Sequence, residues 1–178
     1  AGETPLNLAD YTAAIRDTVG PMGRRLTFEP GRRLVANAGA LLSRVLYVKP
    51  GAERPIVILD AAMNDLARPA VYGAHHDIMP ARRPTTAESD WIATDFVGSI
   101  CESGDLFARA RPAPPLAPGD LVAFGAAGAY GAAMASLYNS RAIAPEILVR
   151  GAEWAELRPR IAPESLIGFE NLPPWRGA

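Results

Sequence analysis

The sequence predicts an α+β protein that is mostly β, with one helical segment near its start and short strands over the rest. Apolar residues recur at helical spacing from Tyr11 through Ile15 to Val19. Apolar runs typical of strands then occur between residues 45 and 149, and segments rich in proline or glycine separate them. This order favours a small αβ unit followed by a β-barrel or β-sandwich domain.

The first element is a helix that Asn7 can cap, with Asp10 three positions further on. Gly20 and Pro21 are typical of a helix end, and the apolar segment 26–28 predicts a short strand after the loop. Helix, loop and strand in this order form one αβ unit.

A β-hairpin is expected to open the β domain. Apolar residues keep helical spacing from Leu34 to Leu42, but Gly39 and the apolar run 45–48 indicate a change to strand. The two strands of the hairpin are predicted at 45–48 and 55–60, and the turn between them is predicted at 50–52. The boundary is therefore expected near residues 39–44, which divides the chain into domains 1–40 and 41–178.

Later elements are shorter and more irregular. A helical or irregular segment is expected at 64–74, and strands are expected at 91–100, 121–124 and 147–149. Loops or turns are predicted at 80–87, 101–105 and 110–119, and a poorly ordered tail is predicted from about residue 172.

Charge and cysteine content exclude several classes of function. The 178 residues contain 18 Lys plus Arg and 19 Asp plus Glu, so nothing indicates a nucleic-acid or membrane-surface partner. A single cysteine, Cys101, rules out an intramolecular disulfide and fits a cytoplasmic location. The uncharged stretch 121–140 is rich in Ala and Gly rather than Leu and Ile, which favours a soluble interior over a membrane span.

The segment Glu29-Pro30-Gly31-Arg32 carries the first chemical signal. Gly31 permits close approach of the backbone to a ligand, and a helix start beside arginine can hold a phosphate. Glu29 would repel an anion, so we expect it to face a cationic part of the same ligand. A phosphate joined to a cationic ring nitrogen suggests pyridoxal phosphate as cofactor.

Four segments in the same order are similar to the C-terminal part of the diaminopimelate decarboxylases, which depend on pyridoxal phosphate and share the fold of alanine racemase and ornithine decarboxylase. They are Glu29–Arg32, Asp60–Leu66, Cys101–Asp105 and Ala127–Gly131. The resemblance covers nearly the whole chain and fades after about residue 160. Because each segment alone is common, the resemblance depends on all four together.

The resemblance implies an architecture. The family combines a (β/α)8 barrel with a β domain, and a barrel alone takes about 250 residues. Residues 1–40 would then be the last αβ unit of the barrel that binds the cofactor, and 41–178 the C-terminal β domain. The family also implies a homodimer whose active sites are shared across the interface.

The resemblance also assigns roles to residues. Cys101 matches the proton donor and Glu102 a substrate-binding residue, and both reach the active site of the partner subunit. The cofactor-binding positions are Glu29, Pro30, Gly31, Arg32 and Tyr130, and the substrate-binding positions are Arg32, Arg68, Tyr72, Glu102 and Tyr130. The reaction implied is the conversion of meso-diaminopimelate to L-lysine and CO₂, as a step of lysine biosynthesis.

The chemistry of these side chains suits such roles. Loss of CO₂ leaves a carbanion that an acid must protonate, and thiols are largely protonated at pH 7. Glu102 and Asp105 are expected to favour the neutral thiol by charge repulsion. At the end of diaminopimelate that does not react, arginine suits the carboxylate and Glu102 suits the ammonium group.

One residue of the family pattern is missing. The lysine that attaches the cofactor lies in an early barrel strand of the family, and Lys49, the only lysine here, matches a β-domain strand instead. We therefore expect this chain alone to be inactive. His75 and His76 offer too few ligands for a metal, so no metal site is predicted.

Two other interpretations remain open. A sister decarboxylase for ornithine, arginine or carboxynorspermidine would keep the same fold, although Glu102 after the cysteine and Arg68 favour a distal amino-acid group. A non-catalytic β-domain module for dimerisation or regulation would need none of Arg32, Arg68, Cys101 and Tyr130.

Overall fold

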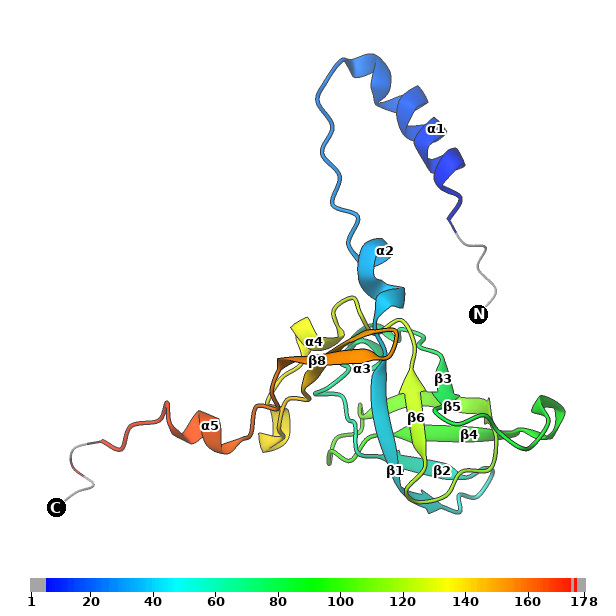
Figure 1. Cartoon of the computed structure of the whole chain (residues 1–178), viewed down its shortest axis with the longest axis vertical. Coiled ribbons are helices and arrows are strands. Elements are labelled where there is room, and N and C mark those ends of the chain that lie inside the picture. The colour runs from blue at the N-terminus through cyan, green and yellow to red at the C-terminus, as the bar shows by residue number, and fades with distance from the viewer. Residues whose placement is uncertain (1–5, 174, 176–178) are drawn as a thin grey trace. The chain divides into compact units, whose positions relative to one another are not determined.

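A computed structural model describes residues 6–173 and residue 175. The chain divides into two compact units between Gly31 and Arg32, and each unit is described by itself (Figure 1). The predicted tail from residue 172 lies largely outside the described residues. No helix within the described part is long and apolar enough to cross a membrane.

The first unit consists of helix α1 (Leu8–Thr18), the 3-10 turn η1 (Gly20–Met22) and an extended segment. As predicted, Asn7 caps α1, and its side chain accepts a hydrogen bond from the Ala9 N–H at 2.8 Å. The strand predicted at 26–28 is wrong, because this segment is extended but unpaired. A strand requires a hydrogen-bonded neighbour, and the described residues of this unit contain no second extended segment to supply one.

The second unit begins with the short helix α2 (Arg32–Val35) and the 3-10 turn η2 (Ala36–Ala38), and then enters a six-stranded sheet. The strands are β1 (Leu41–Lys49), β2 (Ile56–Leu59), β3 (Ile78–Pro80), β4 (Ile92–Val97), β5 (Leu106–Ala113) and β6 (Leu121–Phe124). Their order is β3-β6-β1-β2-β4-β5, and every neighbouring pair is antiparallel except β2 and β4. The predicted hairpin of β1 and β2 is confirmed, with β1 starting four residues earlier than expected.

The loop predicted at 110–119 is partly wrong, because residues 110–113 continue strand β5. Pro112 lies opposite Ala93 of β4, and β5 is an edge strand of the sheet. Proline is tolerated there because an edge strand does not need every backbone N–H for pairing. Pro112 therefore marks an edge position, whereas the three later prolines lie in the predicted loop.

The sheet curves so that its two edges approach each other. Arg111 of β5 donates a hydrogen bond from Nη1 to the backbone oxygen of His76, just before β3, at 3.0 Å. Inside the curve, the rings of Phe107 and Phe124 pack with their centroids 4.6 Å apart. The buried core includes Val45, Val57, Leu59, Leu66, Phe96, Val122 and Phe124. The C-terminal sheet domain is thus nearly closed, like a barrel (Figure 1).

Short elements connect and follow these strands. They are α3 (Arg68–Tyr72), η3 (Glu88–Asp90), α4 (Gly131–Met134), η4 (Tyr138–Ser140) and α5 (Glu164–Ile167). Strands β7 (Glu146–Arg150) and β8 (Glu153–Arg158) form a separate two-stranded sheet. The sequence analysis predicted β7 but not β8, whose side chains are exposed except at its last residue and so lack the alternation of a half-buried strand.

Candidate active site

Three of the predicted substrate- and cofactor-binding side chains come together at α3 and α4. The guanidinium carbon of Arg68 lies 5.5 Å from the ring centroid of Tyr72 and 5.5 Å from that of Tyr130. Arg68 and Tyr72 are four residues apart on α3, so they share one face of that helix. Such cation–π contacts contribute about 0.5–1 kcal/mol each at exposed sites. We call Arg68, Tyr72 and Tyr130 the Arg68 cluster.

The Arg68 cluster presents charge and hydroxyl groups to solvent. Tyr72 and Tyr130 are both exposed, whereas Nε of Arg68 is buried. Tyr130 has a left-handed backbone conformation, with φ at 70°, immediately before α4. This is an uncommon conformation for a residue with a side chain, and it is typical of tight turns and functional sites.

Close packing of two glycines fixes the loop that carries Tyr130. A Cβ atom on Gly39 would lie 2.6 Å from Cα of Gly128, and one on Gly128 would overlap the backbone oxygen of Val35. The Gly128 N–H donates to the backbone oxygen of Ala36 at 3.0 Å. The Tyr130 loop is therefore attached to η2, which directly follows the helix that Arg32 begins.

His76, four residues after the end of α3, is only 3 % exposed. Its Nδ1–H donates to the backbone oxygen of Gly125 at 2.9 Å, which leaves Nε2 as the acceptor nitrogen. Burial lowers the pKa of His76, although the hydrogen bond to Gly125 opposes this shift. The nearby positive charges of Arg32 and Arg68 lower the pKa further, so the imidazole is neutral at pH 7.

The predicted proton donor lies on a different surface turn. We call residues 101–105, between β4 and β5, the Cys101 turn. The Cys101 side chain is exposed, and Glu102 accepts hydrogen bonds from the Gly104 N–H and the Tyr138 hydroxyl, both at 3.2 Å. The hydrogen bond to the Glu102 carboxylate raises the pKa of Tyr138. The turn thus presents a thiol and a carboxylate outward.

Asp105 anchors the Cys101 turn from inside. It is 4 % exposed, and its carboxylate accepts hydrogen bonds from the backbone N–H groups of Met63 at 2.7 Å and Ile100 at 2.8 Å. Burial raises the pKa of Asp105, and these two hydrogen bonds oppose the rise. The Asp105 carboxylate is thus turned into the protein and holds the backbone of the turn.

The Arg68 cluster and the Cys101 turn are separate. Among the described residues, no hydrogen bond, ion pair or cation–π contact connects the two sets. Glu29, Pro30 and Gly31 belong to the first unit, where Gly31 has a φ of 49° that favours glycine, and Arg32 begins the second unit. The structure brings together Arg68, Tyr72 and Tyr130, but it does not join Cys101 and Glu102 to them.

The loop after β2 contains a polar network that supports the Cys101 turn. The sequence analysis gave these residues no separate role. The side-chain oxygen of Asn64, which is 2 % exposed, accepts a hydrogen bond from Nε of Arg141 at 3.0 Å. Arg141 also donates to the backbone oxygen of Asp60. Met63, which donates to Asp105, lies in this same loop. The available signal was the group of polar residues Asp60, Asn64 and Asp65 in the loop after a buried strand.

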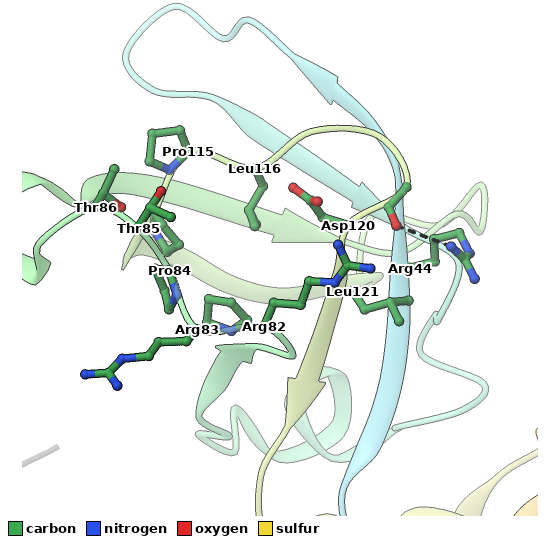
Figure 2. Close-up of a pocket in the computed structure, with 13 residues that line it drawn as sticks. Arg44, Arg82, Arg83, Pro84, Thr85, Thr86, Pro115, Leu116, Asp120 and Leu121 are labelled. Carbon is green, nitrogen blue, oxygen red and sulfur yellow. Dashed lines mark hydrogen bonds between the residues drawn. The ribbon is translucent and has the colours of Figure 1, made fainter.

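A hollow with a cavity volume of about 540 Å³ lies elsewhere on the sheet. Figure 2 shows it between the loop that carries Arg82 and the loop that leads to Asp120. The Arg83 side chain points away from it, and Nη1 of Arg44 donates a hydrogen bond to the backbone oxygen of Gly119 at 3.2 Å. Its lining includes none of the predicted site residues, so we do not assign it to the active site.

Comparisons with known proteins show the family of the chain. Residues 9–128 match the family model described as pyridoxal-dependent decarboxylase, C-terminal sheet domain. The chain is 43 % identical to the diaminopimelate decarboxylase of Zymomonas mobilis over 171 residues, and 45 % identical to that of Pseudomonas aeruginosa over 172 residues. These matches cover 96 % and 97 % of this chain but 40 % of each relative.

Solved structures show the same likeness. The Helicobacter pylori diaminopimelate decarboxylase in complex with L-lysine superposes with a TM-score of 0.83 at 36 % identity, over 94 % of this chain and 41 % of that one. The M. jannaschii enzyme in complex with L-lysine gives a TM-score of 0.86 at 32 % identity, over 98 % and 41 % of the two chains. The chain thus spans about 40 % of the length of the relatives it matches. By sequence and by fold, it belongs to the pyridoxal-dependent decarboxylases and contains the C-terminal sheet domain of that family.

Proposed function

We propose that this chain supplies the substrate-binding side and the proton donor of a decarboxylase that converts meso-diaminopimelate to L-lysine and CO₂. The observation that carries the proposal is the Arg68 cluster, because it holds a guanidinium against the rings of two exposed tyrosines. A guanidinium suits the carboxylate at the unreacted end of the substrate. The names of the relatives in the comparisons support the same substrate.

The residues of this chain fit one side of a pyridoxal phosphate site. The hydroxyl of Tyr130 and the guanidinium of Arg32 suit a phosphate group, and Glu29 suits the pyridine nitrogen. Lys49 does not fit the attachment point, because it lies in β1 opposite Ile56 of β2. When bound, the cofactor would accept the electron pair that CO₂ leaves behind. Residues up to about 40 would belong to the last αβ unit of the cofactor-binding barrel.

The Cys101 turn would act in the active site of a second copy. Its thiol is exposed and makes no contact with the Arg68 cluster, which agrees with a two-fold homodimer that shares its sites. In that arrangement Cys101 donates a proton to the carbanion carbon, and Glu102 binds the distal ammonium group. The bond between Glu102 and Tyr138 would hold this carboxylate in a fixed orientation.

The test uses this chain in two forms. In one form the 178 residues are assayed alone with added pyridoxal phosphate. In the other they replace the matching C-terminal part of the Zymomonas mobilis relative, which gives a chimera with a complete barrel. We expect lysine and CO₂ from meso-diaminopimelate only in the chimera, and a large loss of turnover in its Cys101→Ala variant.

A matched control and competing substrates sharpen this test. Ser103→Ala changes a neighbouring side chain of the same turn and should keep turnover near that of the parent chimera. A chimera that binds the cofactor but decarboxylates ornithine, arginine or carboxynorspermidine instead of diaminopimelate would refute the proposed substrate. Lysine formation by the 178 residues alone would refute the expectation that they are inactive.

A further inference from the structure

Residues 136–141, which we call the Tyr138 segment, follow α4 and reach the Cys101 turn through the Tyr138 side chain. The Tyr138 hydroxyl donates a hydrogen bond to Oε2 of Glu102 at 3.2 Å, and the Gly104 N–H donates to Oε1 of the same carboxylate at 3.2 Å. One donor alone would leave this exposed carboxylate able to rotate, whereas two donors on two different oxygens fix its plane. The orientation of Glu102 therefore depends on the position of Tyr138.

The backbone of the Tyr138 segment has an uncommon conformation. Asn139 and Ser140 are both left-handed, with φ of 60° and 53°. Such a conformation costs free energy for a residue with a side chain, and it persists only where the surrounding structure holds it. The segment therefore needs contacts outside itself that keep it in place.

Asn64, which is 2 % exposed, supplies contacts at both ends of the segment. At the first end, its backbone oxygen accepts the Ser136 N–H at 2.9 Å, and its Nδ2–H donates to the backbone oxygen of Ser136 at 3.2 Å. At the other end, its Oδ1 accepts a hydrogen bond from Nε of Arg141 at 3.0 Å. The Tyr138 N–H in turn donates to Oγ of Ser136 at 3.4 Å. One buried residue thus connects both ends of the segment that carries Tyr138.

The loop that contains Asn64 also holds the Cys101 turn. The N–H of Met63, the residue before Asn64, donates to the buried carboxylate of Asp105 at 2.7 Å. The turn that carries Glu102 and the segment that carries Tyr138 are therefore attached to adjacent residues of one loop. This common attachment keeps the Tyr138 hydroxyl within hydrogen-bond distance of Glu102.

We propose that Asn64 is a positioning residue for Glu102: it holds the Tyr138 segment at both ends, so that the Tyr138 hydroxyl orients the Glu102 carboxylate for an ammonium group. Asn64 does not touch the ligand, because its side chain is buried. The binding of the distal ammonium group of the substrate rests on the proposed function. The series of hydrogen bonds from Asn64 to Glu102 does not rest on it.

The primary test measures the kinetics of the chimera. Asn64→Asp keeps the size of the side chain and the acceptor for Arg141, but it replaces the donor to Ser136 with a second oxygen. We expect the KM for meso-diaminopimelate to rise about three- to tenfold and kcat to change much less, because the proton donor and the reacting end of the substrate are unaffected. Tyr138→Phe should raise KM by a similar factor, since it removes only the hydroxyl that binds Glu102.

The double variant distinguishes positioning from a general loss of structure. If Asn64 acts through Tyr138, combining Asn64→Asp with Tyr138→Phe should raise KM no further than either change alone. Effects on KM that multiply would overturn the proposal, as would an Asn64→Asp chimera that loses kcat at unchanged KM.

Asn139→Asp is the matched control, because it makes the same chemical change within the Tyr138 segment. The Asn139 side chain is exposed and has no hydrogen-bond partner among the described residues, so its variant should keep KM within about twofold of the parent. A rise in KM equal to that of Asn64→Asp would show that added charge, rather than lost positioning, is the cause, and would overturn the proposal.

A second measurement needs neither substrate nor cofactor and can be made on the 178-residue chain and on the chimera alike. The hydrogen bond to Glu102 raises the pKa of Tyr138 above its ordinary value of 10.0. NMR titration with ¹³C-labelled tyrosine follows this pKa, and the signal that Tyr138→Phe removes is that of Tyr138. We expect the pKa to fall toward 10.0 in both Glu102→Gln and Asn64→Asp, and to stay unchanged in Asn139→Asp.

Methyl signals of the buried residues Val45 and Leu59 report whether each variant keeps its fold during the titration. A Tyr138 pKa that falls in Glu102→Gln but not in a folded Asn64→Asp protein would overturn the positioning role of Asn64. The expected titration in a chimera that does not decarboxylate diaminopimelate would support this role and refute only the proposed function.

Discussion

The Arg68 cluster and the Cys101 turn both expose reactive groups, but opposite kinds of buried residue support them. Close in sequence to the Arg68 cluster, after α3, is His76, a buried base whose pKa is lowered. Beneath the Cys101 turn lies Asp105, a buried acid whose pKa is raised. In both cases the side chain that bonds inward is separate from those that face solvent. Each surface thus has its own buried polar residue, which supports our proposal that the two surfaces act in different active sites.

The largest expected effect is at the support of the Cys101 turn. Asp105→Ala leaves the N–H groups of Met63 and Ile100 without their acceptor, so we expect the free energy of unfolding to fall by about 2–4 kcal/mol. Urea denaturation measures the change. Asp120→Ala is the matched control, since Asp120 accepts one N–H, that of Ala117, in an exposed loop. Equal losses in the two variants would show that Asp105 is no special anchor.

Glycine substitutions should also distinguish the two regions, with a smaller effect on the free energy of unfolding. Gly128→Ala places Cβ against the backbone of Val35, so we expect a loss of about 1–3 kcal/mol in the free energy of unfolding. In the Cys101 turn, Gly104→Ala meets nothing closer than 3.9 Å and should stay within about 0.5 kcal/mol of the parent. Thermal and urea denaturation of both variants provide the measurement. A costly Gly104→Ala together with a harmless Gly128→Ala would reverse the comparison.

A smaller effect concerns pH, where the two supports should respond in opposite directions. The folded pKa of His76 is below its unfolded value of 6.5, so the unfolded state binds more protons. Its contribution to stability is present above the unfolded value and is lost as pH falls toward the folded one. The folded pKa of Asp105 is above its unfolded value of 3.8, so its contribution is present below that value and is lost as pH rises through the folded pKa.

Two variants separate these contributions. His76→Asn should flatten the loss of stability below about pH 6.5, and Asp105→Asn should flatten the loss above about pH 4. Urea midpoints recorded across both pH ranges test the slopes, with His75→Asn as the control for the first range. A His76→Asn protein that keeps the slope of the parent would contradict a buried neutral imidazole.

The sequence predicted the elements whose signals are local. The Asn7 cap, the β1–β2 hairpin and the turn at 101–105 depend on neighbouring residues, and the structure has all three. The prediction failed where the pairing of strands determines the structure. Residues 26–28 are extended without a partner, and Pro112 pairs at an edge strand that local rules assign to a loop.

The exposed side chains of the site could be predicted from the sequence, but the buried residues near them could not. Arg68 and Tyr72 share a helix face that their spacing predicts, whereas the contact of Arg68 with Tyr130 joins residues 62 positions apart. The inward direction of Asp105 depends on Met63, which belongs to another loop. His76 looked ordinary because burial and tautomer are properties of the folded protein alone.

The most direct test of whether the two regions serve different active sites is complementation between two inactive chimeras, Arg68→Ala and Cys101→Ala. If each active site takes Arg68 from one subunit and Cys101 from the other, a mixed dimer has one intact site. Random exchange of subunits should then restore about a quarter of the parent activity in lysine formation. No recovery in a mixture shown to contain mixed dimers would place both residues in one subunit's site and contradict the account.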